Sequence, residues 1–372
     1  MKNILVTGSN GFIGKNLIQA LSRYEEINIL HFDVDNSLDE LSTHLDTADF
    51  IYHLAGVNRP KNEDEFKEIN TGLTQTIVDL LSKKGRNVPI AMTSSIQAEL
   101  DNPYGISKKN AENALMNYGK SMKCPICIYR LPNVFGKWCR PNYNSVVATF
   151  CHKIAHGEEI WVSDETHEIA LVYIDDVVKN LVSLPGEKLS MGESHYSISR
   201  TFKITLGRLV ELITSFKEMR TSSILPNFSD GLTKFLYSTY LSYLEENDFA
   251  YDVELKKDER GHLFELLKSP SFGQIFVSTT KKGVTRGNHY HNSKVEKFCL
   301  VKGNAKIRLR RIEGEEIIDY EVSDKNIRIV DIPPGYTHSI ENIGEDEMIV
   351  IFWANEVFDN NDPDTFYEVV QK

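Results

Sequence analysis

The chain has 372 residues, which is more than one hydrophobic core usually supports, so we expect two domains. Its composition, 41% hydrophobic and 26% charged, is that of an ordinary globular protein. A net charge of −11 argues against nucleic acid or an anionic membrane surface as a partner, because both need a concentrated basic face. Five cysteines, no signal-peptide pattern and no long apolar stretch predict a cytoplasmic protein with a small-molecule partner.

Strand-like runs alternate with helical patterns up to about residue 185, which predicts a parallel sheet wrapped by helices. These strands are expected at residues 4–6, 27–32, 50–54, 90–93 and 126–129. Residues 202–251 are mostly helical in pattern, and from residue 252 onward short strands between turn residues predict a small antiparallel β barrel. We therefore predict an α/β domain over residues 1–245 and an all-β domain over residues 246–372.

The string TGSNGFIG at residues 7–14 follows the first predicted strand and opens a helix. Its glycines stand where the chain must turn tightly, approach a pyrophosphate and pack helix on strand, and the phosphate would lie at the helix N-terminus. This pattern predicts a Rossmann dinucleotide site contributed by Gly8, Gly11, Phe12, Ile13 and Gly14. Asp33 follows the second strand, where an acid bonds the adenosine ribose and favours NAD; a solvated turn aspartate is the alternative.

The string NPYGISKKNAE places Tyr104 and Lys108 four residues apart on one face of a predicted helix. A lysine ammonium near a phenol favours the phenolate and is expected to lower the pKa of Tyr104. Tyr104 could then protonate a carbonyl oxygen while hydride arrives at the carbon. Ser95, at the end of the strand that finishes in TSSI, could hydrogen-bond the same carbonyl.

Over about 240 residues the chain resembles the extended short-chain dehydrogenases/reductases. The resemblance rests on the glycine turn, Ser95, Tyr104 and Lys108, together with HLAG at 53–56, Asn70, RLPNVFG at 130–136 and YIDDVV at 173–178. It implies that Lys108 also holds the nicotinamide ribose. For the nucleotide-sugar side it implies Asn58, Arg59, Asn133 and Asn142.

Two strings in the second domain predict a metal site. GVTRGNHYHNSKVEKFCLVKG at 283–303 contains His289, His291 and Glu296, and PPGYTHSIEN contains His338. Histidines two apart on a strand point to one side, and three histidines with one carboxylate suit Zn²⁺, Fe²⁺, Ni²⁺ or Mn²⁺. Both strings resemble the cupin motifs, although Ile327 stands where the second motif has a glycine. Scattered core histidines are the alternative.

DERGHLFE at 258–265 and GVTRGNHY at 283–290 resemble segments of the dTDP-4-keto-sugar epimerases of rhamnose synthesis. That resemblance implies that Arg260 and Arg286 hold the nucleotide phosphates, that His289 is a base and that Lys297 steadies an enolate. A histidine nitrogen on a metal has no lone pair left to take a proton, so we assign His289 as a ligand.

End to end, the chain resembles bifunctional capsular polysaccharide enzymes that fuse these two folds. The resemblance implies C3 epimerisation of a UDP-4-keto-6-deoxy-HexNAc in the cupin, then C4 reduction in the Rossmann domain to UDP-2-acetamido-2,6-dideoxy-L-talose on the N-acetyl-L-fucosamine route. It also implies NADPH, with NADH favoured by Asp33, a divalent metal, expected to be zinc, and a homodimer through the cupin.

Two alternatives remain for the whole chain. One is a single-function NAD-dependent sugar-nucleotide epimerase or dehydratase with a structural, dimerising cupin. The other is a sugar-nucleotide binding protein without turnover, against which the intact pair of Tyr104 and Lys108 speaks.

Overall fold

The computed structural model describes residues 1–60 and 62–371. Contacts divide the chain into two compact units: Met1–Thr214 with Lys234–Leu244, and Ser215–Thr233 with the chain from Glu245 onward. The predicted domain boundary after residue 245 stays a prediction, and residue 372 of the predicted second domain lies outside the described residues. None of the helices described in these ranges is long and apolar enough to cross a membrane.

The first unit is built on a six-stranded sheet in the order β2-β1-β3-β4-β5-β8, in which every neighbouring pair is parallel. Its strands are β1 (Lys2–Thr7), β2 (Ile27–Phe32), β3 (Phe50–His53), β4 (Ile90–Ser95), β5 (Pro125–Leu131) and β8 (Gly192–Tyr196). The predicted α/β fold with a parallel sheet is confirmed. Parallel strands present their carboxyl ends at one edge of a sheet, which is where ligands bind in such folds.

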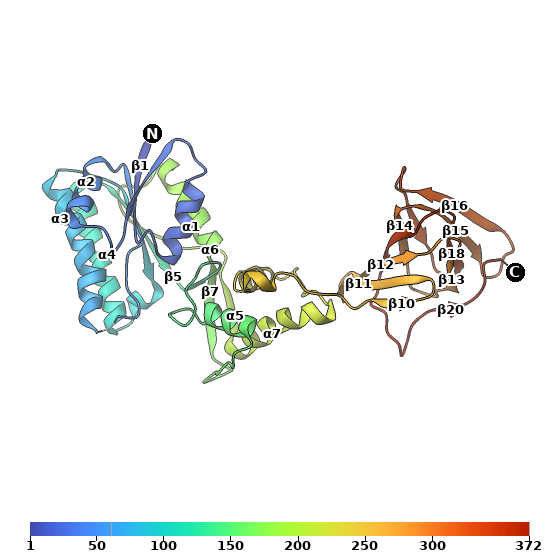
Figure 1. Cartoon of the computed structure of the whole chain (residues 1–372). Helices are drawn as coiled ribbons and strands as arrows, with labels where there is room; N and C mark the ends of the chain where they lie inside the picture. The colour runs from blue at the N-terminus through green and yellow to red at the C-terminus, as the bar shows by residue number, and fades with distance from the viewer. Residues whose placement is uncertain (61, 372) are drawn as a thin grey trace. The chain divides into compact units, whose positions relative to one another are not determined.

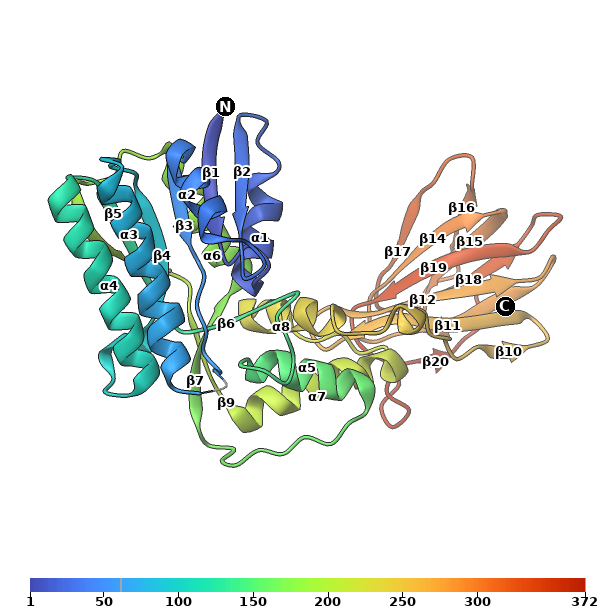
Figure 2. The same ribbon diagram turned by 60° about the vertical axis from the view of Figure 1, so that its left-hand side comes forward.

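Helices cover both faces of this sheet, as Figures 1 and 2 show: α3 and α4 lie on one face with α2, and α1 and α6 lie on the other. Their bounds are α1 (Phe12–Leu21), α2 (Leu38–Thr47), α3 (Leu73–Lys83), α4 (Pro103–Met122) and α6 (Ile174–Ser183). Because both faces are covered, the strands read as continuous apolar runs, and Ile4, Leu5 and Val6 are fully buried.

A smaller sheet, in the order β6-β7-β9, takes two strands from between β5 and β8 in the chain and one from after β8. Its strands are β6 (Asn133–Phe135), β7 (Glu168–Tyr173) and β9 (Phe202–Thr205), and the helices α5 (Val146–His156), α7 (Leu206–Ser222) and α8 (Gly231–Leu241) come from the same part of the chain. The 202–251 region is therefore largely helical, as its pattern predicts.

Beyond residue 255 the second unit is all-β and forms two antiparallel sheets, ordered β10-β11-β12-β19-β14-β17 and β16-β15-β18-β13-β20. One buried cluster takes Phe298, Val350 and Phe352 from the first sheet and Ile307 and Ile340 from the second, so the sheets pack face to face. Figure 2 labels most of these strands. Their bounds are β10 (Lys256–Asp258), β11 (Gly261–Ser269), β12 (Gly273–Thr280), β13 (Thr285–Tyr290), β14 (Glu296–Lys302), β15 (Asn304–Arg311), β16 (Ile317–Ser323), β17 (Ile329–Ile332), β18 (Tyr336–Asn342), β19 (Met348–Ala354) and β20 (Phe366–Tyr367).

Candidate active sites and metal centre

The glycine turn between β1 and α1 has the close approaches that its spacing predicts. Gly8 has φ of +70°, which favours glycine, and a Cβ on Gly14 would lie 2.1 Å from the Gly8 carbonyl oxygen. Gly11 is the N-cap of α1, with no side-chain cap and no acid in the first turn of the helix. The first amides of α1, at Phe12 and Ile13, are thus open to an anion such as a pyrophosphate.

Asp33 lies directly beyond the end of β2 and next to this turn. Its Oδ2 accepts a hydrogen bond of 2.6 Å from the Asn10 amide, and its own amide donates to Asn36 Oδ1 at 2.8 Å. The carboxylate is therefore fixed beside the glycine turn, where an acid could bond a ribose. The choice between NAD and NADP stays a prediction.

The structure brings Ser95, Tyr104 and Lys108 together at the carboxyl end of β4. The Ser95 hydroxyl hydrogen-bonds the Tyr104 phenol, and the Lys108 ammonium donates to the Thr93 carbonyl at 3.0 Å. Lys108 also faces the loop after β3, because a Cβ added to Gly56 would lie 3.4 Å from its Nζ. This arrangement is suited to protonating a substrate carbonyl.

The structure contradicts the expectation that the pKa of Tyr104 is lowered. Burial raises the pKa of Tyr104, and the hydrogen bond from Ser95 opposes this only in part. Burial likewise lowers the pKa of Lys108 to about 8, with the Glu112 carboxylate opposing the shift. In this state the phenol keeps its proton, which is the form that a general acid needs before transfer.

Glu112, one turn beyond Lys108, is a residue that the sequence analysis missed. Its side chain is fully buried and accepts hydrogen bonds from Ser94 Oγ at 2.6 Å and from Arg130 Nε at 3.0 Å and Nη2 at 2.6 Å. These hydrogen bonds of Glu112 tie α4 to β4 and β5 one helical turn from Lys108. The sequence signals that could have revealed the Glu112–Arg130 pair are the NAE at residues 110–112 and the arginine that opens RLPNVFG.

Three of the four predicted substrate residues line one pocket of about 560 Å³: Arg59, Asn133 and Asn142. Asn133 Nδ2 donates to the Ala170 carbonyl at 3.1 Å. The pocket also contains Lys153, a second cation that the sequence analysis did not select. Asn58 does not line this pocket, but its Oδ1 is buried without a hydrogen-bond partner among the described residues, as expected of a group that awaits a ligand.

The four predicted metal ligands converge in the second unit. One nitrogen or oxygen from each of His289, His291, Glu296 and His338 lies within 4.8 Å of the others. Register explains the convergence: His289 on β13 pairs with His338 on β18, while Glu296 begins β14 in the facing sheet. Burial and the neighbouring His338 lower the pKa of His289 to about 4, so its imidazole is neutral at pH 7.

The donor atoms of this cluster fit a small divalent cation. Nε2 of His291 and Nε2 of His338 are buried with no hydrogen-bond partner among the described residues, and they lie 3.4 and 3.3 Å from one Glu296 oxygen. Two ligands each about 2.0–2.1 Å from a tetrahedral zinc would be roughly 3.3 Å apart. Orphaned buried nitrogens at this spacing are the expected form of a metal site.

Arg260 and Arg286 also lie together, on either side of Asp258. The Asp258 carboxylate accepts a hydrogen bond from Arg260 Nη2 at 2.6 Å and forms a longer ion pair with Arg286 Nη2 at 3.7 Å. Register places Arg286 opposite Ile340 and His289 opposite His338, so both side chains leave β13 on the face that carries the histidine cluster. Two arginines with one shared counter-ion beside the cluster could hold a diphosphate.

Lys297 does not join the cluster. It follows Glu296 on β14, so it points to the opposite face of the sheet, and its ammonium pairs with Asp331 on β17. Its side chain is 44% exposed, whereas Glu296 and Phe298 on either side are buried. The expected part of Lys297 in steadying an enolate is therefore not supported by its position.

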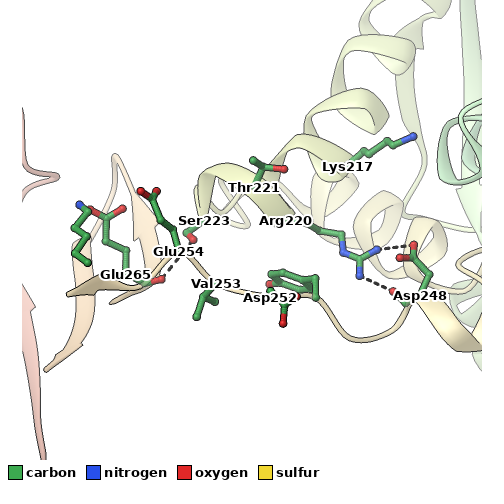
Figure 3. Close-up of a pocket in the computed structure, with 11 residues that line it drawn as sticks. Lys217, Arg220, Thr221, Ser223, Asp248, Asp252, Val253, Glu254 and Glu265 are labelled. Carbon is green, nitrogen blue, oxygen red and sulfur yellow. Dashed lines mark hydrogen bonds and ion pairs between the residues drawn. The ribbon is translucent and has the colours of Figure 1, made fainter. Parts of the chain in front are cut away.

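A further pocket of about 510 Å³ lies in the second unit, and Figure 3 shows its charged side chains. Arg220 Nη1 pairs with Asp248 at 2.6 Å, and its guanidinium lies 4.8 Å from the centre of the Tyr251 ring. Lys256 pairs with Glu265 at 2.9 Å. These charges satisfy one another, so we assign no ligand to this pocket.

Comparison with known proteins gives the family. A model described as the NAD dependent epimerase/dehydratase family matches residues 4–198, more than half of the chain. The chain belongs to this family. A second model, the polysaccharide biosynthesis C-terminal domain, matches residues 256–366. In this member of the NAD dependent epimerase/dehydratase family, the second match thus coincides with the two antiparallel sheets of the second unit.

Two similar proteins extend over both units. The UDP-2-acetamido-2,6-beta-L-arabino-hexul-4-ose reductase of Pseudomonas aeruginosa is 45% identical over 98% of this chain and 97% of its own length. The crystal structure of the capsular polysaccharide assembling protein CapF from Staphylococcus aureus is 44% identical, with a TM-score of 0.92 over 99% of this chain and 100% of that one. The predicted likeness to a capsular polysaccharide enzyme is confirmed, and the chain is an enzyme of the reductase and epimerase class.

A more distant likeness concerns the fold alone. UDP-glucuronic acid 4-epimerase from Bacillus cereus, solved in complex with NAD, is 18% identical, with a TM-score of 0.56 over 65% of this chain and 98% of that one. The share of this chain that is covered is about that of the first, Rossmann-type unit.

Proposed function

We propose that the chain is a bifunctional sugar-nucleotide enzyme. Its second unit, a metal-binding cupin, epimerises C3 of a UDP-4-keto-6-deoxy-HexNAc, and its first unit reduces C4 to give UDP-2-acetamido-2,6-dideoxy-L-talose for capsule or O-antigen synthesis. The observation that carries the reductase is the convergence of Ser95, Tyr104 and Lys108 at the carboxyl end of β4. A relative that is 45% identical is named as the reductase of a UDP-linked hexul-4-ose, which supports a 4-keto substrate.

In the reductase, the nicotinamide cofactor supplies hydride when bound. Tyr104 gives its phenolic proton to the C4 oxygen, and Ser95 donates a hydrogen bond to the same oxygen. Lys108 holds the nicotinamide ribose, while the glycine turn holds the pyrophosphate. Asp33 bonds the adenosine ribose, so NADH is used readily even if NADPH is accepted. Arg59, Asn133, Asn142 and Asn58 take the UDP-sugar, assisted by Lys153.

In the cupin, His289, His291, Glu296 and His338 hold the divalent cation, and zinc suits this donor set. When bound, the cation supplies a positive charge that stabilises negative charge on the 4-keto oxygen. Arg260 and Arg286 hold the diphosphate of the substrate, which fixes the sugar relative to the cluster. A base takes the C3 proton to give an enolate, and delivery of a solvent-exchangeable proton to the other face of C3 inverts that centre. Epimerisation must come first, because reducing the ketone ends the acidity of that C–H bond.

Isotope exchange separates the two activities. Metal-replete enzyme incubated with the 4-keto substrate in D₂O without nicotinamide should place deuterium at C3, detected by NMR and mass spectrometry. Tyr104→Phe should leave this exchange unchanged and His291→Ala should lose it. Given its outward position, Lys297→Ala should retain most of the exchange. Absence of C3 labelling in an enzyme that still reduces the ketone would favour the alternative, a single-function enzyme with a structural cupin.

We also propose a homodimer through the second unit. In the β10-β11-β12-β19-β14-β17 sheet, register aligns four side chains of the outer face in one row across four strands: Ile329, Cys299, Ile351 and Val277. Ile329 is 64% exposed on the edge strand β17 and Ile351 is 36% exposed. An apolar row of this kind at an open sheet edge favours pairing with a second copy. Ile329→Lys should give a monomer in light scattering at micromolar concentration, and a wild type that is already monomeric would contradict the dimer.

A further inference from the structure

The last segment of the chain runs along the strand that carries the histidines. We define residues 363–370 as the C-terminal strap. Its β20 pairs antiparallel with β13, with Tyr367 opposite His289 and Phe366 opposite Tyr290. β13 would otherwise be an edge strand of its sheet, and the strap covers that edge. The strap therefore lies against the backbone of the predicted metal cluster.

One hydrogen bond connects the strap directly to a metal ligand. His291 Nδ1 lies 2.6 Å from the backbone carbonyl oxygen of Asp364. A carbonyl only accepts, so Nδ1 carries the proton, and in the neutral ring Nε2 then holds the lone pair. Nε2 is the buried, unpartnered nitrogen that lies 3.4 Å from Glu296 Oε2. The strap thus selects the tautomer, and the ring orientation, in which His291 can bind a cation.

We propose that the C-terminal strap is a working part of the metal centre and that Asp364 is the positioning residue for His291. This inference rests on the proposed metal site. Asp364 does not touch the cation; it acts through its carbonyl on His291 and through its carboxylate on the turn that follows His291.

The Asp364 carboxylate holds the strap to that turn. It accepts hydrogen bonds from the amides of Asn292 at 2.9 Å, Ser293 at 2.9 Å and Lys294 at 2.8 Å, and from the Ser293 hydroxyl at 2.9 Å. Asp364 itself has φ of +36°, in the left-handed region that disfavours L-residues other than glycine. Four hydrogen bonds offset this strain, so the carboxylate is what keeps the carbonyl aimed at His291.

Two buried cations fasten the strap on either side of Asp364. The Lys294 ammonium is nearly inaccessible to solvent and donates to the Pro363 carbonyl at 2.5 Å. Arg310 is buried on β15 and donates to the carbonyls of Val370 at 2.9 Å and Val369 at 2.8 Å. A strap held at both ends presents its carbonyl to His291 in one position.

The test measures binding of Zn²⁺ alone to the full-length enzyme, by competition with a chromogenic chelator, and records the visible absorption of the Co²⁺ form. Asp364→Gly removes the carboxylate and also relieves the φ strain, so any loss reports the hydrogen bonds. Asp364→Asn keeps one oxygen acceptor and the left-handed preference. Asp362→Ala is the matched control, because Asp362 lies directly before the strap, is exposed and makes no hydrogen bond among the described residues.

Loss of a ligand-orienting partner typically weakens metal affinity about 10–100-fold, and we expect this loss for Asp364→Gly. Asp364→Asn should lie between it and wild type, Asp362→Ala should bind as wild type does, and the Co²⁺ bands should shift in Asp364→Gly. A strap that only stabilises the fold would lower the melting temperature of the metal-free variant and leave affinity and bands unchanged, which overturns the inference. If Asp364→Gly does not fold, Asp364→Asn decides by the same two readouts. A wild type that binds neither metal would instead overturn the metal centre itself.

Discussion

Replacing Glu112 with glutamine removes one charge from beneath the Ser95, Tyr104 and Lys108 cluster and almost no volume. The carboxylate accepts two hydrogen bonds from Arg130 and one from Ser94. Breaking a buried ion pair costs about 3–5 kcal/mol. Arg130 is 20% exposed and keeps Glu99 as a second partner, so we expect the lower end, about 3 kcal/mol.

The matched control is Glu99→Gln, because Glu99 binds the same guanidinium at 2.8 Å but is 71% exposed. An exposed pair contributes about 0–1 kcal/mol. For a unit of this size 1 kcal/mol corresponds to about 2–4 °C, so Glu112→Gln should lower the melting temperature by roughly 6–12 °C and Glu99→Gln by no more than about 4 °C. The full-length protein has two units, so the melting transition to compare is the one whose midpoint temperature rises when cofactor is added.

The pH dependence provides a second check. Burial alone would raise the pKa of Glu112, but the hydrogen bonds from Arg130 and Ser94 hold it below its usual value of 4.5. A carboxyl with a depressed folded pKa stabilises fully above the unfolded value and loses that contribution as pH falls through the folded value. The gap between wild type and Glu112→Gln should therefore be full at pH 7 and shrink below about pH 4.5. Equal losses for both glutamine variants, or a gap that widens in acid, would refute the reasoning.

Three further changes test the first unit. Tyr104→Phe should abolish ketone-dependent oxidation of the reduced cofactor at 340 nm while leaving cofactor binding intact, and near-normal turnover would remove Tyr104 from the mechanism. Asp33→Ala should shift the kcat/KM ratio toward NADPH through loss of about 1–3 kcal/mol of hydrogen bonding and repulsion; an unchanged ratio would make Asp33 a bystander. Gly14→Ala would place a Cβ 2.1 Å from the Gly8 carbonyl oxygen, so cofactor affinity measured by fluorescence should fall about tenfold or more, while Gly186→Ala, where a Cβ meets no atom within 4 Å and φ is not positive, should not change it.

Local patterns were sufficient for the parts of this protein that depend on neighbours in the chain. The turn TGSNGFIG needs glycines for reasons of backbone geometry, so its spacing predicted the strand, the turn and the helix together. His289 lies on β13 opposite His338 on β18, and His291 directly follows the end of β13, so motif spacing predicted the cluster that the structure brings within 4.8 Å.

Only the tertiary structure decided what depends on burial, on register and on distant segments. Sequence spacing placed Lys108 near Tyr104 and suggested a lowered phenol pKa, but burial raises it, and burial is a property of the whole packed unit. Lys297 follows Glu296 by one residue, and alternation along β14 turned it to the outer face. Asp364 lies 73 residues beyond His291, so no local pattern could reveal that its carbonyl selects the tautomer of that histidine. Contacts of this kind exist only once the sheets have paired, since strand pairing alone brings such distant residues together.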